Sequence, residues 1–142
     1  MAPGRYHRPD NPGLGESGWQ ALYLALAPET CIGEILRNTP PDLMRNLNSY
    51  RLSEIEVLLV AVIDCRAVTS FGISMDNLTG DHNYETTQRI AQSAVQTSSE
   101  AILVPSATRL GDNLVIFPDN LKPGSRIEVV ASRDPALYVE RD

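Results

Sequence analysis

The apolar residues of this chain fall into short runs between turn-forming residues, a pattern that predicts both strands and helices. Residues 20–25 suit a buried strand. Pro28 then favours a helix over residues 28–37, because the first helical turn does not need the N–H that proline lacks. We expect a short helix over 42–47. Residues 57–63 are rich in β-branched side chains and apolar on both faces, which predicts a central strand covered on two sides.

The second half of the chain predicts one further helix and three strands. A turn-rich segment at 76–81 is expected to be a connector, and apolar residues recur at helical spacing over 84–97. Three strand-like runs follow, at 101–104, 114–117 and 127–131. The sequence Lys122-Pro123-Gly124-Ser125 predicts a turn before the last run. We therefore predict an α+β fold, a single domain over residues 1–142 with a mixed, mainly antiparallel sheet and flanking helices.

The first twenty residues contain seven glycines and prolines, which excludes a regular helix or a central strand there. This density predicts a long loop, either ordered or mobile. Loops of this length in compact domains usually have a function. We therefore expect residues 1–20 to form a Gly/Pro-rich loop that contacts a substrate.

Composition and charge narrow the classes of partner. Hydrophobic residues make up 42% of the chain and charged residues 21%, as in globular proteins. The net charge of −6 argues against direct binding of nucleic acid, which depends on concentrated positive charge. The longest apolar run is too short to span a bilayer, and the N-terminus does not resemble a signal peptide. We expect a cytoplasmic protein that binds a small substrate or another protein, without membrane contact.

The cysteines and histidines give no indication of a metal site. Cys31 and Cys65 are isolated in apolar surroundings, so we expect buried, reduced thiols rather than a disulfide. His7 and His82 are the only histidines, and no spacing typical of metal ligands is present. We therefore expect no bound metal.

Four short sequence motifs, which we call words, place polar residues within otherwise apolar stretches and follow one another along the chain. They are Gly4-Arg5-Tyr6-His7, Ala21-Leu22-Tyr23-Leu24-Ala25, Ile32-Gly33-Glu34 and Val104-Pro105-Ser106-Ala107. Their order and settings resemble the RES domain family, which is named for its Arg, Glu and Ser. The resemblance runs from Gly4 to about Phe117. It implies a fold similar to diphtheria-type ADP-ribosyltransferases and the activity of an NAD-consuming toxin from a bacterial toxin–antitoxin pair.

The resemblance also implies a reaction and a partner. The reaction is cleavage of the nicotinamide–ribose bond of NAD⁺, by a glycohydrolase or a phosphorylase, with NAD⁺ as substrate and no cofactor. Transfer of the ADP-ribosyl group to a protein, by an ADP-ribosyltransferase, stays open as an alternative. The implied partner is a cognate antitoxin, often Xre-like, whose own DNA-binding part would contact DNA. Formation of a homo-oligomer also stays open.

Two alternatives to an active enzyme remain. Family members generally begin with a strand and a loop before the Gly-Arg word, whereas only Met1-Ala2-Pro3 precede it here. This difference supports a catalytically weak RES-like binding module that holds NAD or a partner protein. A structural subunit whose motif matches are coincidental is the third hypothesis.

Positive charge is concentrated near the start of this acidic chain, at Arg5, His7 and Arg8. A guanidinium offers a planar fork of donors that suits phosphate oxygens, although local sequence alone favours a solvated basic loop. The resemblance makes Arg5 a catalytic residue that also binds the pyrophosphate of NAD⁺. Tyr6 and His7 join it as substrate-binding candidates, while a solvated loop remains an equal alternative for His7 and Arg8.

Tyr23 and Glu34 are the other catalytic candidates. Strand alternation places Tyr23 opposite its leucine neighbours, where an aromatic side chain is usually core. The resemblance implies instead that Tyr23 stacks on the nicotinamide or its ribose. Glu34 borders the apolar stripe of its helix, as a surface glutamate would. The resemblance makes it the carboxylate under the anomeric carbon, where it would stabilise oxocarbenium charge. The neighbouring Gly33, which is costly inside a helix, indicates close approach of another segment.

Ser106 follows a predicted strand, where its hydroxyl could simply cap a turn. The resemblance makes it a pocket residue that positions the ribose or Glu34. Asn113 is a further substrate-binding candidate, and Tyr84 is a weaker one. The chain contains no Gly-x-Ser-x-Gly turn and no Gly-x-Gly-x-x-Gly fingerprint, which argues against a serine hydrolase and against a Rossmann site. We expect the catalytic candidates and Ser106 to converge on one cleft.

Overall fold

The computed structural model describes residues 4–38, 50–67, 72–80 and 84–138. The strands are β1 (Leu22–Ala25), β2 (Leu52–Leu58), β3 (Val62–Asp64), β4 (Ala101–Pro105), β5 (Asp112–Ile116) and β6 (Arg126–Arg133). The helices are α1 (Pro28–Asn38), α2 (Met75–Thr79) and α3 (Glu85–Gln96), with 3-10 turns at Pro12–Leu14, Pro118–Asn120 and Pro135–Tyr138. The helix expected over 42–47 lies outside the described residues. No helix in the described part is long and apolar enough to cross a bilayer.

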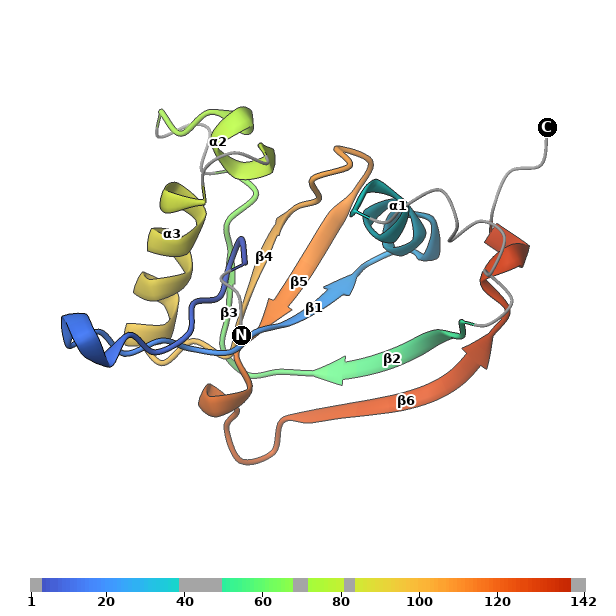
Figure 1. Cartoon of the computed structure of the whole chain (residues 1–142). Coiled ribbons are helices and arrows are strands. Elements are labelled where there is room, and N and C mark those ends of the chain that lie inside the picture. Colours follow the sequence, from blue (N-terminus) through green and yellow to red (C-terminus); the bar gives the residue numbers. More distant parts are fainter. Residues whose placement is uncertain (1–3, 39–49, 68–71, 81–83, 139–142) are drawn as a thin grey trace.

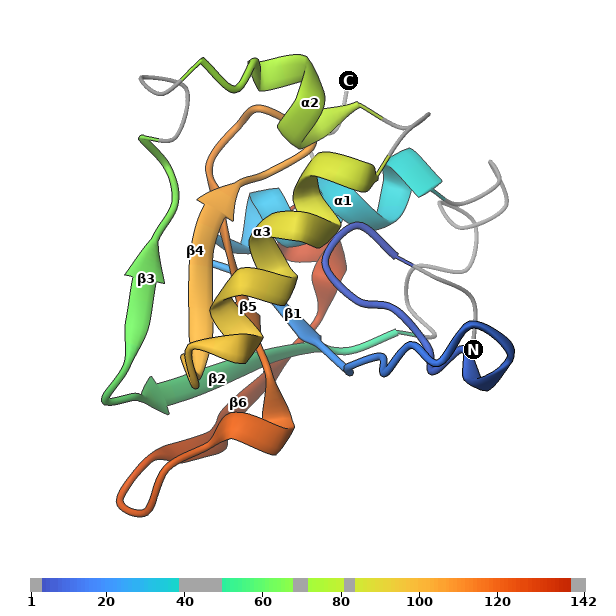
Figure 2. The ribbon, with the colours of Figure 1, turned by 90° about the vertical axis from the view of Figure 1, so that its left-hand side faces the viewer.

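The strands form a four-stranded sheet and a separate two-stranded ribbon (Figure 1). In the sheet, of order β1-β5-β4-β3, β5 pairs antiparallel with β1 and β4, whereas β3 pairs parallel with β4. Parallel neighbours need a long crossover, and the segment carrying α2 and α3 supplies it. Figure 2 shows α3 lying across one face of this sheet. The predicted α+β class, with a mixed, mainly antiparallel sheet and flanking helices, is confirmed.

The ribbon consists of β2 and β6, which pair antiparallel with each other. The register shifts at Glu54/Ile55, where Val130 is the extra residue on β6 and forms a bulge that increases the twist. The predicted turn before β6 is present. The Ser125 N–H donates to the Lys122 carbonyl at 3.1 Å, and Gly124 adopts a φ of +89°, which favours glycine.

The prediction of one buried strand over residues 57–63 is wrong. β2 ends at Leu58, and β3 begins only at Val62. Between the two strands the chain passes from the ribbon to the edge of the sheet, and Val60 is 70% exposed. The β-branched composition therefore indicated strand structure correctly. It did not reveal that residues 57–63 contain the end of one edge strand and the start of another.

The predicted connector at 76–81 also needs correction, because it contains the helix α2. The helix starts at a cap in which the Ser74 hydroxyl accepts the Asn77 N–H at 3.0 Å. Leu78 and Thr79 are buried. The cap and the buried side chains depend on the fold around this short helix, so composition alone does not distinguish it from a turn-rich segment.

The predicted helices at 28–37 and 84–97 are confirmed as α1 and α3. α1 begins at Pro28, as expected from the N–H that proline lacks. α3 buries Thr87, Ala91 and Ala94, and these small side chains allow the helix to approach the sheet closely. The hydrophobic core contains residues of α3, of the sheet and of the N-terminal loop. They are Tyr6, Trp19, Cys65, Ala91, Ala94, Ile102, Val104, Val115 and Phe117.

A fully buried carboxylate joins the ribbon to the sheet. Glu100, just before β4, accepts the N–H groups of Val60 and Ala61 on Oε1, at 2.7 and 2.8 Å. Its Oε2 accepts the N–H of Lys122 at 3.0 Å. Burial alone would raise the pKa of Glu100, but hydrogen bonds, among them those from the backbone N–H groups of Lys122, Ala61 and Val60, outweigh it and lower the pKa to about 2. Glu100 thus binds both segments that connect the sheet to the ribbon, the one between β2 and β3 and the one between β5 and β6.

The N-terminal segment is an ordered loop that packs on the sheet and α3 (Figure 2). As predicted, it holds no long helix or strand within the described residues. Isolated bridges between Arg8 and Trp19 and between Asn11 and Glu16 close it into a hairpin-like loop. The Trp19 indole donates to the Tyr6 carbonyl at 2.7 Å, which fixes the Gly-Arg word against the core.

Candidate active site

A cavity of about 380 Å³ lies between the N-terminal loop, β1, α1 and the end of β4. Its volume falls in the range of small-molecule sites, roughly 300–1,000 Å³. Arg5, Tyr6, His7, Tyr23, Glu34, Tyr84 and Asn113 are among its lining residues. Residues separated by more than a hundred positions therefore share one cavity, which we call the site cavity.

One oxygen of the Glu34 side chain accepts three hydrogen bonds in the site cavity. Its Oε1 accepts the Ser106 hydroxyl, the Ala107 N–H at 3.0 Å and the Asn113 side-chain amide at 3.0 Å. These donors come from the end of β4 and the start of β5, so three contacts from the sheet fix one oxygen of a helical side chain. Such preorganisation is what stabilisation of a charged transition state requires.

Ser106 is fully buried beneath the site cavity and does not line it. Its hydroxyl accepts the Thr108 N–H at 3.1 Å and also lies 2.8 Å from the Thr108 hydroxyl. The hydroxyl caps the turn after β4 and also donates to Glu34, as the two hypotheses describe. The expectation that Ser106 is itself a pocket residue needs correction, because the turn buries its side chain completely. The sequence analysis did not identify Ala107 or Thr108, and only their closeness to Ser106 in the sequence could have indicated them.

Two glycines allow α1 to lie against the turn between β4 and β5. A Cβ on Gly33 would lie 3.2 Å from the Thr108 methyl group, which explains the glycine inside the helix. Gly111 has a φ of +129°, and a Cβ there would lie 2.7 Å from the Thr30 hydroxyl. The Thr30 hydroxyl donates to the Leu110 carbonyl at 2.9 Å. This packing places Glu34 above Ser106.

Arg5 lines the site cavity and also binds the end of α2. Its Nη1 donates to the Leu78 carbonyl at 3.1 Å and to the Gly80 carbonyl at 2.6 Å. The guanidinium carbon lies 4.8 Å from the centre of the Tyr84 ring, a cation–π distance. Arg5 is therefore held by helix-end carbonyls and an aromatic face, and differs from the solvated arginine that local sequence favours.

Tyr23, His7 and Tyr6 form an aromatic group on one wall. The Tyr23 hydroxyl accepts the Tyr6 N–H at 3.0 Å and lies 2.6 Å from Nδ1 of His7. Burial raises the pKa of Tyr23 to about 12, so its hydroxyl stays protonated at neutral pH. The tautomer of His7 determines which of the two groups donates in the Tyr23–His7 hydrogen bond. Tyr6 is 2% exposed and is mainly a core residue, although it contributes to the wall.

The remaining candidates divide between the wall of the site cavity and its surroundings. Asn113 lines the cavity, and while its amide bonds to Glu34, its buried Oδ1 has no hydrogen-bond partner. Arg8 lies away from the cavity, over the Trp19 ring, and donates to the Ser17 carbonyl. Cys31 lines the cavity as a half-buried free thiol, so the expectation of full burial is wrong for Cys31, whereas Cys65 is buried as predicted.

Within the described residues, no three His, Cys, Asp or Glu side chains gather as metal ligands would. The site cavity instead offers one carboxylate fixed by neutral donors, one guanidinium and three tyrosines. This combination can bind an anionic, ring-containing molecule and stabilise positive charge that develops beside Glu34.

The chain is an α+β domain in which Glu34, on a helix, is hydrogen-bonded to the turn that contains Ser106. Glu34 shares its cavity with Arg5 of the N-terminal loop. This combination of fold and site defines the class of protein. The sequence profile described as RES domain matches residues 1–140. The chain therefore belongs to the RES domain family, and the resemblance proposed from the four words is confirmed.

Among solved structures, the chain is similar to the MbcT–MbcA toxin–antitoxin complex of M. tuberculosis. The two chains share 28% sequence identity with a TM-score of 0.71, and the match covers 95% of this chain and 74% of that chain. The solved structure therefore supports the α+β fold described above. No curated protein is similar in sequence to this chain.

Proposed function

We propose that this chain is a toxin that consumes NAD⁺ by cleaving its nicotinamide–ribose bond. The observation that carries the proposal is the Oε1 atom of Glu34, held by three donors inside a cavity that Arg5 and Tyr23 also line. Membership of the RES domain family and likeness to a toxin–antitoxin complex support it.

The chemistry follows from the charges of the reaction. Loss of nicotinamide leaves positive charge on the ribose, and a carboxylate fixed beneath the anomeric carbon stabilises that charge. Because three donors hold Glu34, the protein does not need to reorient it as the charge develops. Arg5 faces the same cavity and would pair with the pyrophosphate, while Tyr23 offers an aromatic face to the nicotinamide or its ribose.

The acceptor of the ADP-ribosyl group is water or phosphate in this proposal, which makes the chain an NAD glycohydrolase or phosphorylase. Transfer to a protein side chain is the alternative outcome of the same cleavage. The acceptor depends on which molecule can reach the anomeric carbon from the open side of the site cavity.

The proposed partner is a cognate antitoxin, since free consumption of NAD⁺ would harm the cell that makes the toxin. The structure similar to this chain is itself a complex of a toxin with an antitoxin. Arg5 and His7 of the basic start of the chain line the site cavity, so we expect the antitoxin to direct a carboxylate toward Arg5, as a charge-assisted contact. An Xre-like antitoxin would make any contact with DNA through its own domain.

Incubation of the purified chain with NAD⁺, followed by identification of the products, tests the proposal. We expect nicotinamide to be released with ADP-ribose or its 1-phosphate, and addition of phosphate to distinguish the two. Label transferred to protein would favour the ADP-ribosyltransferase alternative. Absence of nicotinamide release, from a chain that is folded and free of partner, would leave the binding module as the better hypothesis.

Replacement of Arg5 should weaken substrate binding more than it slows the reaction. The pyrophosphate is held in the ground state and the transition state alike, so we expect Arg5→Ala to raise KM for NAD⁺ about 10–100-fold, the loss of a charged hydrogen bond. Arg5→Lys keeps the charge and should raise KM less. Steady-state kinetics separate KM from kcat, and a fall in kcat at constant KM would contradict this role.

A further inference from the structure

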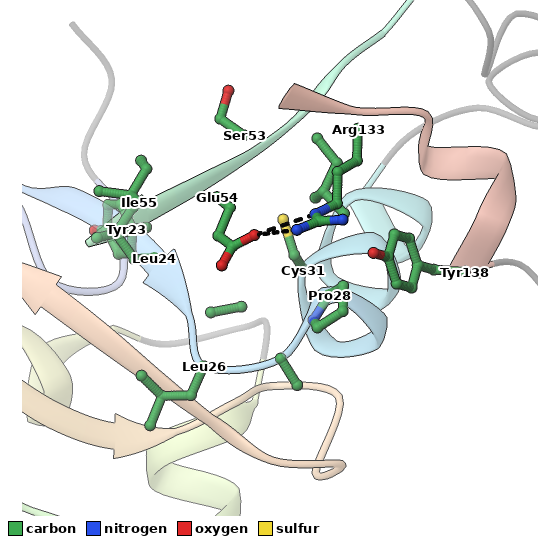
Figure 3. A pocket seen from close by; sticks show the side chains of 13 residues that line it. Tyr23, Leu24, Leu26, Pro28, Cys31, Ser53, Glu54, Ile55, Arg133 and Tyr138 are labelled. Atoms are coloured by element: carbon green, nitrogen blue, oxygen red, sulfur yellow. Dashed lines mark hydrogen bonds and ion pairs between the residues drawn. The ribbon is translucent and has the colours of Figure 1, made fainter. Parts of the chain in front are cut away.

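A second cavity, of about 650 Å³, lies between β1 and β2, next to the site cavity. Figure 1 shows the two strands diverging toward α1, and Figure 3 shows the side chains that line the space between them. We call this cavity the wedge. Residues 23–27 of the sheet side and 52–55 of the ribbon side line it, with Arg133 and Tyr138 at one end.

The β1 side of the wedge presents backbone groups that β5 leaves unused. Leu26 donates its N–H to the Asp112 carbonyl at 3.0 Å, which makes this a hydrogen-bonded pair of the ladder. Hydrogen-bonded and non-hydrogen-bonded pairs alternate in an antiparallel ladder, and Leu24 pairs with Leu114. Leu24 is therefore also bonded to β5. The N–H and C=O groups of Tyr23 and Ala25 must point away from β5, toward the wedge.

The β2 side is also a free edge. β2 pairs with β6 alone, and β1 pairs with β5 alone, in the part of the chain that the structure describes. The wedge thus separates two strand edges, each with backbone groups that an added strand could bond. Exposed edges of this kind bind extended peptides by adding a strand to the sheet.

The volume of the wedge matches a short strand. A strand rises about 3.3 Å per residue, lies about 4.8 Å from its neighbours and about 10 Å from a facing layer, so each residue occupies roughly 160 Å³. The 650 Å³ of the wedge therefore holds about four residues. This length equals that of β1, which has four residues.

The side chains around the wedge indicate the kind of peptide that fits. Leu24, Leu26, Leu52 and Ile55 give it apolar walls. The Glu54–Arg133 ion pair, with N and O atoms 2.7 Å apart, is half-exposed beside them, as Figure 3 shows. These walls favour apolar side chains at alternate positions of an inserted strand, with a polar residue facing the ion pair.

We infer that the wedge binds an extended, alternately apolar segment of a partner protein, which pairs with the backbone of Tyr23 and Ala25. Tyr23, Leu24, Ala25 and Cys31 line both the wedge and the site cavity. A strand bound there lies beside the site and restrains Tyr23, so it couples partner binding to inhibition. The identity of the partner as an antitoxin rests on the proposed function, whereas the pairing rests on the strand edges.

Amide hydrogen exchange of the full chain tests this inference, with the protein encoded by the adjacent reading frame as the probe. In the free chain, the amides of Tyr23 and Ala25 should exchange fast, and Leu24, bonded to β5, should exchange slowly as an internal control. Addition of the probe should slow exchange at Tyr23 and Ala25 about tenfold or more. It should leave Leu24 unchanged.

A pair of variants at Ala25 provides an independent measurement. Ala25→Pro removes an N–H that faces the wedge, a change that edge strands tolerate, and should weaken binding of the probe about tenfold. Ala25→Gly keeps the N–H and should bind as the unmutated chain does. Protection elicited by ADP-ribose in place of the protein, or protection in the free chain that grows with its concentration, would overturn the inference by assigning the wedge to substrate or to a second copy.

The outcomes also distinguish this inference from the proposed function. A probe that binds without slowing exchange at Tyr23 and Ala25 overturns the pairing, even if the chain consumes NAD⁺. Failure of the probe to bind overturns it as well. Protection by the probe of a chain that consumes no NAD⁺ would support the wedge as a docking site and reject the proposed reaction.

Discussion

Replacement of Glu34 by Gln should leave a folded protein with NAD⁺ turnover reduced on the order of 10²–10³-fold, the typical effect of removing one preorganised electrostatic contact. The loss should be in kcat, with KM nearly unchanged, because the carboxylate acts on charge that develops only in the transition state. Nicotinamide release measures turnover, and a thermal melt checks the fold. In cells, growth arrest on expression should disappear with this variant.

Gln is the better replacement because of what the structure adds to the sequence. The position of Glu34 at the border of the apolar stripe predicts that Glu34→Ala costs little stability, within roughly 0.5 kcal/mol. Its Oε1, however, accepts three donors, including that of the fully buried Ser106. We now expect Glu34→Ala to cost about 1–3 kcal/mol, since it leaves these donors without an acceptor. The Gln variant keeps a carbonyl oxygen for them.

Glu29 offers a matched control on the same helix. It lies exposed in the first turn of α1, so Glu29→Gln removes a carboxylate without touching the site cavity. This variant should retain the unmutated rate. If the folded Glu34→Gln protein also consumed NAD⁺ at that rate, the assignment of Glu34 as the catalytic carboxylate would be refuted.

Local pattern predicted most of the secondary structure because each element has its own signal. Pro28 marked the start of α1, and helical spacing over 84–97 identified α3. Burial was less predictable, and the buried strand expected over 20–25 is wrong in this respect, because Leu22 and Tyr23 of β1 are exposed. The run at 57–63 is apolar throughout, but it divides between two edge strands. Whether an apolar strand is central or at an edge depends on which strands pair, and pairing involves residues distant in sequence.

For the candidate site too, the sequence indicated the residues but not their arrangement in space. The words containing Arg5, Glu34 and Ser106 indicated the residues, but no pattern in the sequence states that Ser106 donates to Glu34 across 72 positions. The environment of Arg5 was also hidden, because it depends on the carbonyl of Gly80 at the end of α2, a helix that composition did not reveal. The sequence indicated which residues are candidates, whereas the pairing of the strands determined how these residues lie relative to one another.

No pattern in the sequence indicates a role for Glu100, yet its replacement should have the second large effect, a loss of stability. Its carboxylate accepts backbone N–H groups from the segment just before β3 and from the segment before β6. In Glu100→Gln, one oxygen becomes an amide that cannot accept the N–H it faces. We expect the melting temperature at pH 7 to fall by about 5 °C or more.

The pH dependence identifies the cause of this loss. The pKa of Glu100 is about 2 in the folded chain and about 4.3 in an unfolded one, so its contribution to stability is complete above pH 4.3 and disappears as pH falls toward 2. The unmutated protein and Glu100→Gln should therefore converge in melting temperature across that window.

Two controls make the convergence specific. Glu56→Gln removes a carboxylate from the exposed face of the ribbon and should melt as the unmutated chain does at every pH. Hydrogen bonds from Arg66 also lower the pKa of Asp64 to about 2, but this exposed pair should contribute little, so Asp64→Asn should shift the profile only slightly. A difference between Glu100→Gln and the unmutated chain that stayed constant from pH 7 to pH 2 would show that packing, and not the ionised carboxylate, joins the ribbon to the sheet.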